Sequence, residues 1–103
     1  MSRGKIAAQV GHGALNCYKE ALIKRKDIVL KWEEFCAKIV LQINSEAELI
    51  KVIEKAKNDG VPTSLIADAG RTEIPSGTIT VGAIGPGKLS EIDKYTSHLK
   101  LLV

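Results

Sequence analysis

The stretch from residue 5 to residue 26 constrains this chain most, because it reads as one long helix with little polar surface. At 100° per residue, small and apolar side chains cover most of its circumference, which predicts burial against other elements. Glycine inside a helix costs about 1 kcal/mol relative to alanine, so Gly11 and Gly13 indicate close approach of a backbone, a ligand or a partner helix. The predicted core stripe consists of Ile6, Val10, Ala14, Cys17 and Ala21.

The polar residues of this helix fall on one narrow strip, which holds Lys5, Gln9, His12 and Asn16. A cation, an amide and an imidazole within two turns favour a binding or catalytic site. The alternative is that the strip is simply the side of the helix that faces solvent.

The rest of the chain reads as an alternation of strands and helices. Apolar, β-branched runs predict strands at 37–43, 61–68 and 78–85. A second, shorter helix is predicted up to about residue 37, and a helix begins after Ser45, with Glu48 completing a capping box and Gly60 as the stop. A last short helix spans 88–99. This order predicts one α/β domain over residues 1–103, with a sheet covered on both faces.

A second candidate site lies in the loop DAGRTEIPSGT, residues 68–78. Asp68 ends an apolar strand, and open α/β sheets place their ligand crevices beyond the carboxyl ends of strands. Hydrogen-bond donors follow at Arg71, Thr72, Ser76, Thr78 and Thr80. The alternative is an ordinary polar connection in which Asp68 bonds to nearby backbone groups.

The segment GAIGPGK, residues 82–88, is a near-match to a phosphate-binding loop. That signature requires Ser or Thr after the lysine, and here the next residue is Leu89, which cannot bind magnesium. Pro86 also removes one of the backbone N–H groups that would cradle a phosphate. A tight turn between a strand and a helix is the simpler interpretation.

Composition limits the classes of partner. The aromatic content of 4% argues against base stacking as a major binding mode, and the net charge of +3 favours an anionic partner only weakly. No apolar run approaches the ~20 residues of a membrane span, and no signal peptide opens the chain, so we expect a cytoplasmic protein without a membrane partner. Cys17 and Cys36 match no zinc or redox spacing, which favours reduced thiols.

Three motifs, in order and at the right separations, resemble the type 2 peptidyl-tRNA hydrolase family. GKIAAQVGHGA is similar to the first-helix motif of that family, and SLIADAGRTEIPSGTITVGAIGPG is similar to its long central signature. The ending IDKYTSHLKLL resembles the closing motif of the family. In this family AIGPG is the turn from a strand to a helix, which makes the phosphate-loop match accidental.

The resemblance implies hydrolysis of the ester that joins a peptide to the 3′ end of tRNA, without metal or cofactor. It implies a single α/β domain with a small mixed sheet and helices on both faces, and often a homodimer. Family active-site proposals carry over to Lys5, His12, Asp68 and Thr80 as catalytic residues, with Gln9 and Thr72 close by. We further expect five residues to bind the substrate: Gln9, Arg71, Thr72, Thr78 and Lys88. The cations expected to contact the tRNA backbone are Arg71, Lys24, Arg25, Lys26 and Lys88.

The chain departs from the family pattern at two places. Gly11 stands where members commonly have Ser or Ala before the motif histidine. Members also begin with a strand resembling VLVVRxDL, and this chain has none. We expect the genomic sequence upstream of Met1 to encode that strand, and the alternative is a partner chain that supplies it. The competing hypothesis is a module of the same fold that binds tRNA or protein with impaired catalysis.

Overall fold

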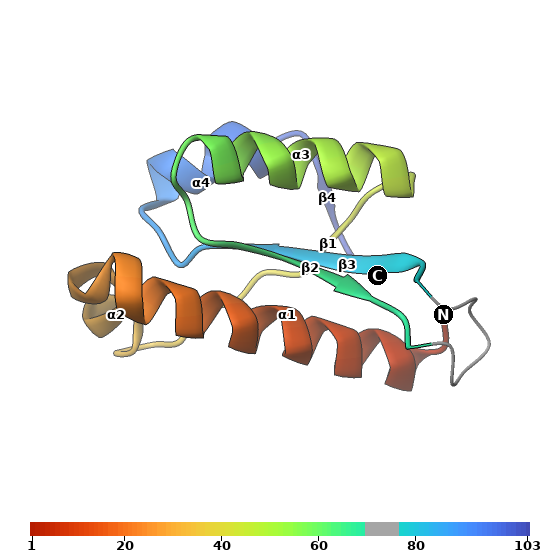
Figure 1. Ribbon diagram of the computed structural model, residues 1–103, viewed down its shortest axis with the longest axis horizontal. Helices are drawn as coiled ribbons and strands as arrows, with labels where there is room; N and C mark the ends of the chain where they lie inside the picture. Colours follow the sequence, from red (N-terminus) through yellow and green to blue (C-terminus); the bar gives the residue numbers. More distant parts are fainter. Residues whose placement is uncertain (70–76) are drawn as a thin grey trace.

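The computed structural model describes residues 1–69 and 77–103. Within them the chain forms four helices and four strands (Figure 1). The helices are α1 (Arg3–Lys24), α2 (Lys26–Trp32), α3 (Glu46–Asn58) and α4 (Leu89–Thr96). The strands are β1 (Leu41–Gln42), β2 (Thr63–Ala67), β3 (Ile79–Ile84) and β4 (Lys100–Leu101).

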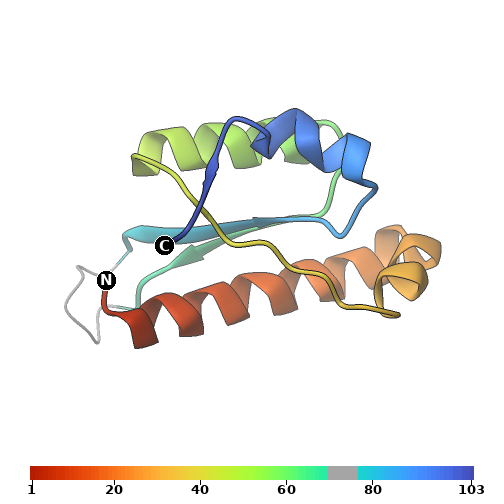
Figure 2. The same cartoon turned by 180° about the vertical axis from the view of Figure 1, so that it is seen from behind.

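The centre of the molecule is an antiparallel hairpin of β2 and β3 between two helical layers. The long helix α1 covers one face of the hairpin, and α3 with α4 covers the other (Figures 1 and 2). The prediction of an α/β fold with helices on both faces is therefore confirmed.

The described strands do not form one mixed sheet by themselves. They form two separate two-stranded sheets, β1–β4 and β2–β3, and both pairings are antiparallel. The strand predicted at 37–43 is reduced to Leu41–Gln42, with one further hydrogen bond from the Leu102 N–H to the Val40 carbonyl. The apolar side chain of Ile39 is 71% exposed. In the described part of the chain only β4 pairs with this segment, which is why most of it forms no ladder.

Helix α1 begins at Arg3, where the Ser2 side chain accepts a hydrogen bond from the Lys5 N–H. Its buried face differs from the predicted stripe, because Ile6, Val10 and Ala14 are only partly buried. A Cβ placed on Gly13 would lie 3.2 Å from the Cβ of Ala83 in β3, so glycine lets helix and strand approach closely. The residues that α1 buries are Gln9, Gly13, Cys17 and Ala21.

Helix α3 matches its prediction. The Ser45 hydroxyl accepts a hydrogen bond from the Glu48 N–H at 3.1 Å, and the chain leaves the helix through Gly60 with φ of +85°. Behind α3 the core consists of Ala56, Val61 and Tyr95, with Val52, Ile84 and Ile92 packed against it.

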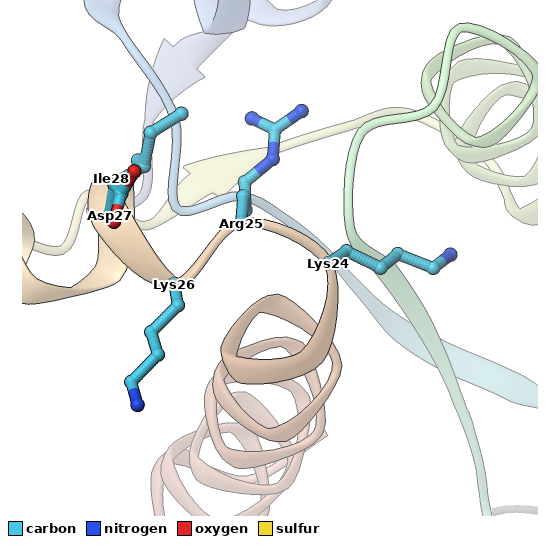
Figure 3. A pocket seen from close by; sticks show the side chains of 5 residues that line it. All are labelled: Lys24, Arg25, Lys26, Asp27 and Ile28. Carbon is cyan, nitrogen blue, oxygen red and sulfur yellow. The ribbon is translucent and has the colours of Figure 1, made fainter.

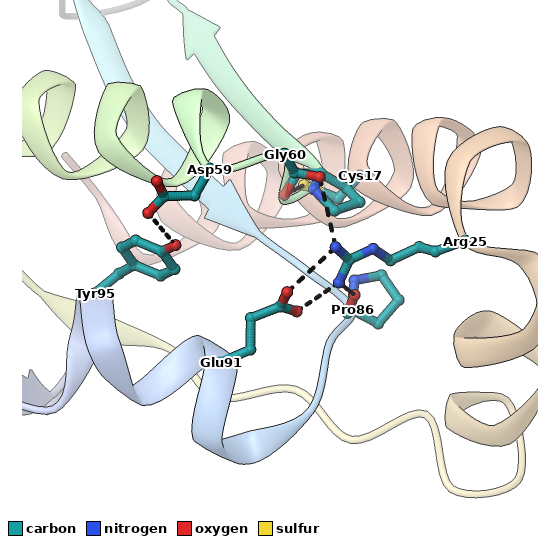
Figure 4. Close-up of polar contacts among 8 residues, drawn as sticks. Cys17, Arg25, Asp59, Gly60, Pro86, Glu91 and Tyr95 are labelled. Atoms are coloured by element: carbon teal, nitrogen blue, oxygen red, sulfur yellow. Dashed lines mark hydrogen bonds and ion pairs between the residues drawn. The ribbon is translucent and has the colours of Figure 1, made fainter.

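Arg25, at the junction of α1 and α2, holds three segments together at one end of the molecule (Figure 4). Its guanidinium binds the Glu91 carboxylate of α4 and donates to the carbonyl oxygens of Pro86 at 3.4 Å and Gly60 at 3.5 Å. These contacts fix the turns that follow β3 and α3 against the end of α1.

Candidate active site

A buried ion pair joins the first turns of α1 to the end of β2. Asp68 follows β2 directly, and its side chain has 0% exposure. Its backbone N–H donates to the Thr78 carbonyl at 2.8 Å, and its own carbonyl accepts from the Gly77 N–H at 2.9 Å. The Lys5 ammonium contacts the Asp68 carboxylate, and the Lys5 side chain is 16% exposed. The site therefore holds a fixed carboxylate next to a cation that reaches solvent.

One helical turn from Lys5, Gln9 is buried against the hairpin. Its Nε2 donates to the Thr80 hydroxyl at 2.7 Å, and the Thr80 hydroxyl donates to the main-chain carbonyl of Ile66 at 3.2 Å. Gln9 is only 6% exposed. The burial of Gln9 does not fit the alternative in which the polar strip of α1 faces solvent, because at Gln9 the strip meets the hairpin.

The polar seam continues toward the carboxyl end of α1. The Asn16 amide donates to the Ser64 hydroxyl at 3.4 Å, and the Glu20 carboxylate accepts from the Thr63 N–H at 3.0 Å. Successive polar residues of α1 thus meet β2 in reverse order, from its end back to its start. His12 is different, because it is exposed and forms no hydrogen bond or ion pair with the described residues.

A family model described as Peptidyl-tRNA hydrolase PTH2 matches residues 1–102. The chain belongs to this family. It is 46% identical to "Probable peptidyl-tRNA hydrolase 2" of Drosophila melanogaster, over 99% of this chain and 55% of that protein. It is also 46% identical to "Peptidyl-tRNA hydrolase" of Methanocaldococcus jannaschii, over 99% of this chain and 90% of that protein.

The relatives differ in length, and some of their names specify the mitochondrion as the cellular compartment. "Peptidyl-tRNA hydrolase 2, mitochondrial" of Homo sapiens is 43% identical over 98% of this chain and 57% of that protein. The chain thus spans a little over half the length of the fly and human relatives and most of the archaeal one. None of the helices within the described residues has the length and apolar character needed to cross a membrane.

In this PTH2 family member the remaining predicted site residues do not all gather at the Lys5–Asp68 pair. Thr78 lies beside the pair, because its carbonyl binds the Asp68 N–H. Lys88 precedes α4 and lies two residues from Pro86, which Arg25 contacts at the opposite end of α1. Arg71 and Thr72 lie outside the described residues.

Two exposed pockets of the described chain have linings that include neither Lys5 nor Asp68. One, of about 330 Å³, lies at the α1–α2 junction, where Lys24 and Lys26 extend in different directions (Figure 3). It is lined by Lys24, Arg25, Lys26, Asp27 and Ile28. A second, of about 360 Å³, is lined by Gln42, Ile43, Asn44, Glu48, His98, Leu99 and Lys100.

The buried thiol of Cys17 adds no nucleophile to the candidate site, and the described residues form no metal cluster. Burial, and secondarily the charge of Glu20, raise the pKa of the Cys17 thiol to about 12, so this sulfur is a poor nucleophile at neutral pH. No group of three or more His, Cys, Asp or Glu side chains in residues 1–69 and 77–103 is arranged to hold a metal ion.

Sequence reasoning missed the main-chain partner of the site. The Ile66 carbonyl accepts the Thr80 proton, which no side-chain pattern could indicate. It also missed Ser64 and Glu20, whose contacts with the seam depend on the packing angle of α1. The residue patterns of TSLIAD and TITVG do not indicate that these strands bind polar side chains of α1.

Proposed function

We propose that this protein hydrolyses the ester bond between peptide and tRNA in peptidyl-tRNA and so releases free tRNA for reuse in translation. Membership of the family supports the proposal, as do the names of relatives that match nearly the whole chain. The observation that carries it is the Lys5–Asp68 pair, with Gln9 one helical turn from Lys5 and hydrogen-bonded to Thr80 of β3.

The proposed reaction is direct attack of water on the ester carbonyl. Asp68 holds the Lys5 ammonium at the end of the hairpin. The positive charge of Lys5 stabilises the oxyanion of the tetrahedral intermediate there. His12, exposed on the same side of α1, takes a proton from the attacking water, since imidazole is the usual general base near neutral pH. Arg71, Thr72 and Thr78 are proposed to bind the aminoacyl end, and Lys88 the tRNA backbone.

Turnover of a model peptidyl-tRNA by purified protein tests this function. We expect release of free tRNA, with kcat/KM reduced at least ~100-fold in Lys5→Met, because an electrostatic contact to the oxyanion is typically worth that much. Retained tRNA binding with no turnover above buffer would contradict hydrolysis and support the tRNA-binding module.

Three finer features of the family resemblance stay proposals. The single mixed sheet would require one further strand that pairs with both β1 and β3, and the extended, exposed segment around Ile39 supports it. A homodimer is supported by the exposed side chain of Phe35, at 86%. We propose a cytoplasmic location, where translation supplies the substrate, although the human relative is named mitochondrial.

A further inference from the structure

We infer that Thr80 is a positioning residue, which orients the Gln9 carboxamide so that Gln9 Oε1 accepts a hydrogen bond from the attacking water. This inference rests on the proposed hydrolysis of peptidyl-tRNA. It assigns Thr80 a role through Gln9, in place of a direct contact with the substrate.

A β-bulge directs Thr80 toward α1. Ile66 is paired with Val81 and Ala67 with Ile79, so Thr80 is the extra residue of β3. In a regular strand alternate residues face the same way, and Gly82 faces α3 while Val81 faces α1. Thr80 would then face α3. The bulge instead turns its side chain to Gln9 on α1, and bulges commonly redirect side chains in this way.

The hydrogen bonds of Thr80 determine which end of the Gln9 carboxamide faces it. A threonine hydroxyl has one proton, and here that proton goes to the Ile66 carbonyl at 3.2 Å. The hydroxyl can then only accept from Gln9, so the NH₂ group must face Thr80, at 2.7 Å. The carboxamide carbonyl therefore points away from Thr80. For the same reason Thr80 has no proton left to donate to a substrate.

The carbonyl of Gln9 is an acceptor that the described protein does not use. Gln9 is 6% exposed, and its bond to Thr80 is the only side-chain hydrogen bond it makes with described residues. No fully buried side-chain oxygen in that part of the chain lacks a partner, so Gln9 Oε1 must reach solvent-accessible space. Gln9 lies on α1 one helical turn from Lys5, whose ammonium contacts the Asp68 carboxylate.

An amide carbonyl can accept a hydrogen bond but cannot remove a proton, which defines the role of Gln9. The water oxygen bonds to the ester carbonyl carbon while one water proton passes to the general base. When the intermediate collapses, the bond to the ribose oxygen breaks and that oxygen takes the proton from the base. The second water proton stays on the oxygen that becomes part of the new carboxyl group. During the attack this O–H donates a hydrogen bond to Gln9 Oε1.

The kinetic experiment compares Thr80→Val, Thr80→Ser and Gln9→Met in peptidyl-tRNA turnover. Valine keeps the shape and removes the hydroxyl, so we expect kcat to fall about 10- to 100-fold with KM within about twofold, as for a misplaced reacting group. Serine restores the hydroxyl and should restore most of kcat. In the double variant, Thr80→Val should lower kcat little beyond the loss caused by Gln9→Met alone, because both substitutions remove the same Gln9–Thr80 hydrogen bond.

A side-chain measurement tests the same inference without turnover. In ¹H–¹⁵N spectra we expect the Gln9 NH₂ signals to be shifted and protected from solvent exchange in the parent and in Thr80→Ser, and to lose both properties in Thr80→Val. Circular dichroism and urea unfolding show that each variant is folded.

The two readouts separate the possible failures. A parent that lacks turnover but has a protected Gln9 amide contradicts the proposed function and leaves the orientation of Gln9 established. Parent-like kcat in folded Thr80→Val overturns the inference, as does a loss confined to KM, which would place Gln9 on the substrate. An unprotected Gln9 amide in the parent overturns it as well.

Discussion

Asp68 combines full burial with a charge, and its counter-ion comes from a residue 63 positions earlier in the chain. A buried carboxylate is stable only when it is paired and hydrogen-bonded. Lys5 supplies that pairing while its own side chain keeps some contact with solvent. The same contact that stabilises the carboxylate thus places a cation at the surface, where a substrate can meet it.

Asp68→Asn tests this residue. Asparagine keeps the shape but removes the charge that holds Lys5, so we expect at least a ~100-fold loss of kcat/KM. We also expect a loss of about 1–3 kcal/mol in the free energy of unfolding, because Lys5 can turn to solvent when its partner is gone. Turnover and urea unfolding measure the two effects. Full activity in the folded variant would remove Asp68 from the mechanism.

The two cysteines should differ in reactivity. Burial raises the pKa of Cys17 to about 12, whereas Cys36 is exposed. The thiolate is the reactive form, and a raised pKa keeps the thiol protonated until the pH approaches that value. At pH 8 we expect Ellman's reagent to modify one thiol in the folded protein and two after denaturation. Rapid reaction of both thiols in the folded protein, or persistence of one fast thiol in Cys36→Ser, would contradict this assignment.

At the scale of elements, glycine allows α1 and α3 to pack closely on the two faces of the β2–β3 hairpin. On the α1 face, Gly13 allows contact with Ala83. On the opposite face, Gly82 lies under α3, where a Cβ would come within 2.7 Å of Ile53 and 2.9 Å of Leu49. Glycine thus occurs at both interfaces of the hairpin, Gly13 on the α1 side and Gly82 on the α3 side. The position of Thr80 in the hairpin depends on this packing.

Gly82→Ala and Gly11→Ala form a matched pair of variants. The added methyl group at Gly82 would overpack the α3 interface, so we expect a loss of about 1–3 kcal/mol in unfolding free energy. At Gly11 a Cβ meets no described atom within 4 Å, so alanine should stabilise the helix by up to about 1 kcal/mol. Urea denaturation measures both changes. Equal effects at the two positions would disagree with the packing described above.

At the scale of the whole molecule, the length of α1 separates two groups of cations. Lys24 follows Lys5 by 19 residues, which places their Cα atoms roughly 28 Å apart along the helix axis at 1.5 Å per residue. Lys88 is also near the Lys24 end of α1, because it lies two residues after Pro86, whose carbonyl accepts a hydrogen bond from Arg25. We expect Lys24, Lys26 and Lys88 to bind the tRNA backbone far from the ion pair, so a tRNA that contacts both groups must extend along the molecule.

Binding of tRNA should weaken steeply as salt is added. Each phosphate contact releases counterions, so a few contacts predict a slope of about −2 to −4 in a plot of log K against log salt. Lys26 forms no ion pair with described residues, so Lys26→Gln should reduce the slope by about 1 if it binds a phosphate. Filter binding of uncharged tRNA at several salt concentrations measures both, and affinity independent of salt would contradict a phosphate-based interaction.

Local patterns in the sequence determined the elements with strong signals of their own. The capping box at Ser45 and the glycine stop at Gly60 predicted α3, because both act through backbone groups a few residues away. The three sequence motifs likewise identified the PTH2 family, to which the family model and the similar relatives assign the chain. These features need no information about distant parts of the chain.

Only the tertiary structure decided which way the first helix faces and how Thr80 is used. Gln9 is a polar residue on the predicted strip, yet it is buried because the Thr80 hydroxyl, 71 residues away, satisfies its amide. Thr80 reaches it only through the bulge between β2 and β3. The extent of β1 was also decided at this level, since its neighbours in space determine how many of its backbone groups are paired. Periodicity reports the polarity of a residue, whereas its environment depends on partners that the chain brings together only when it folds.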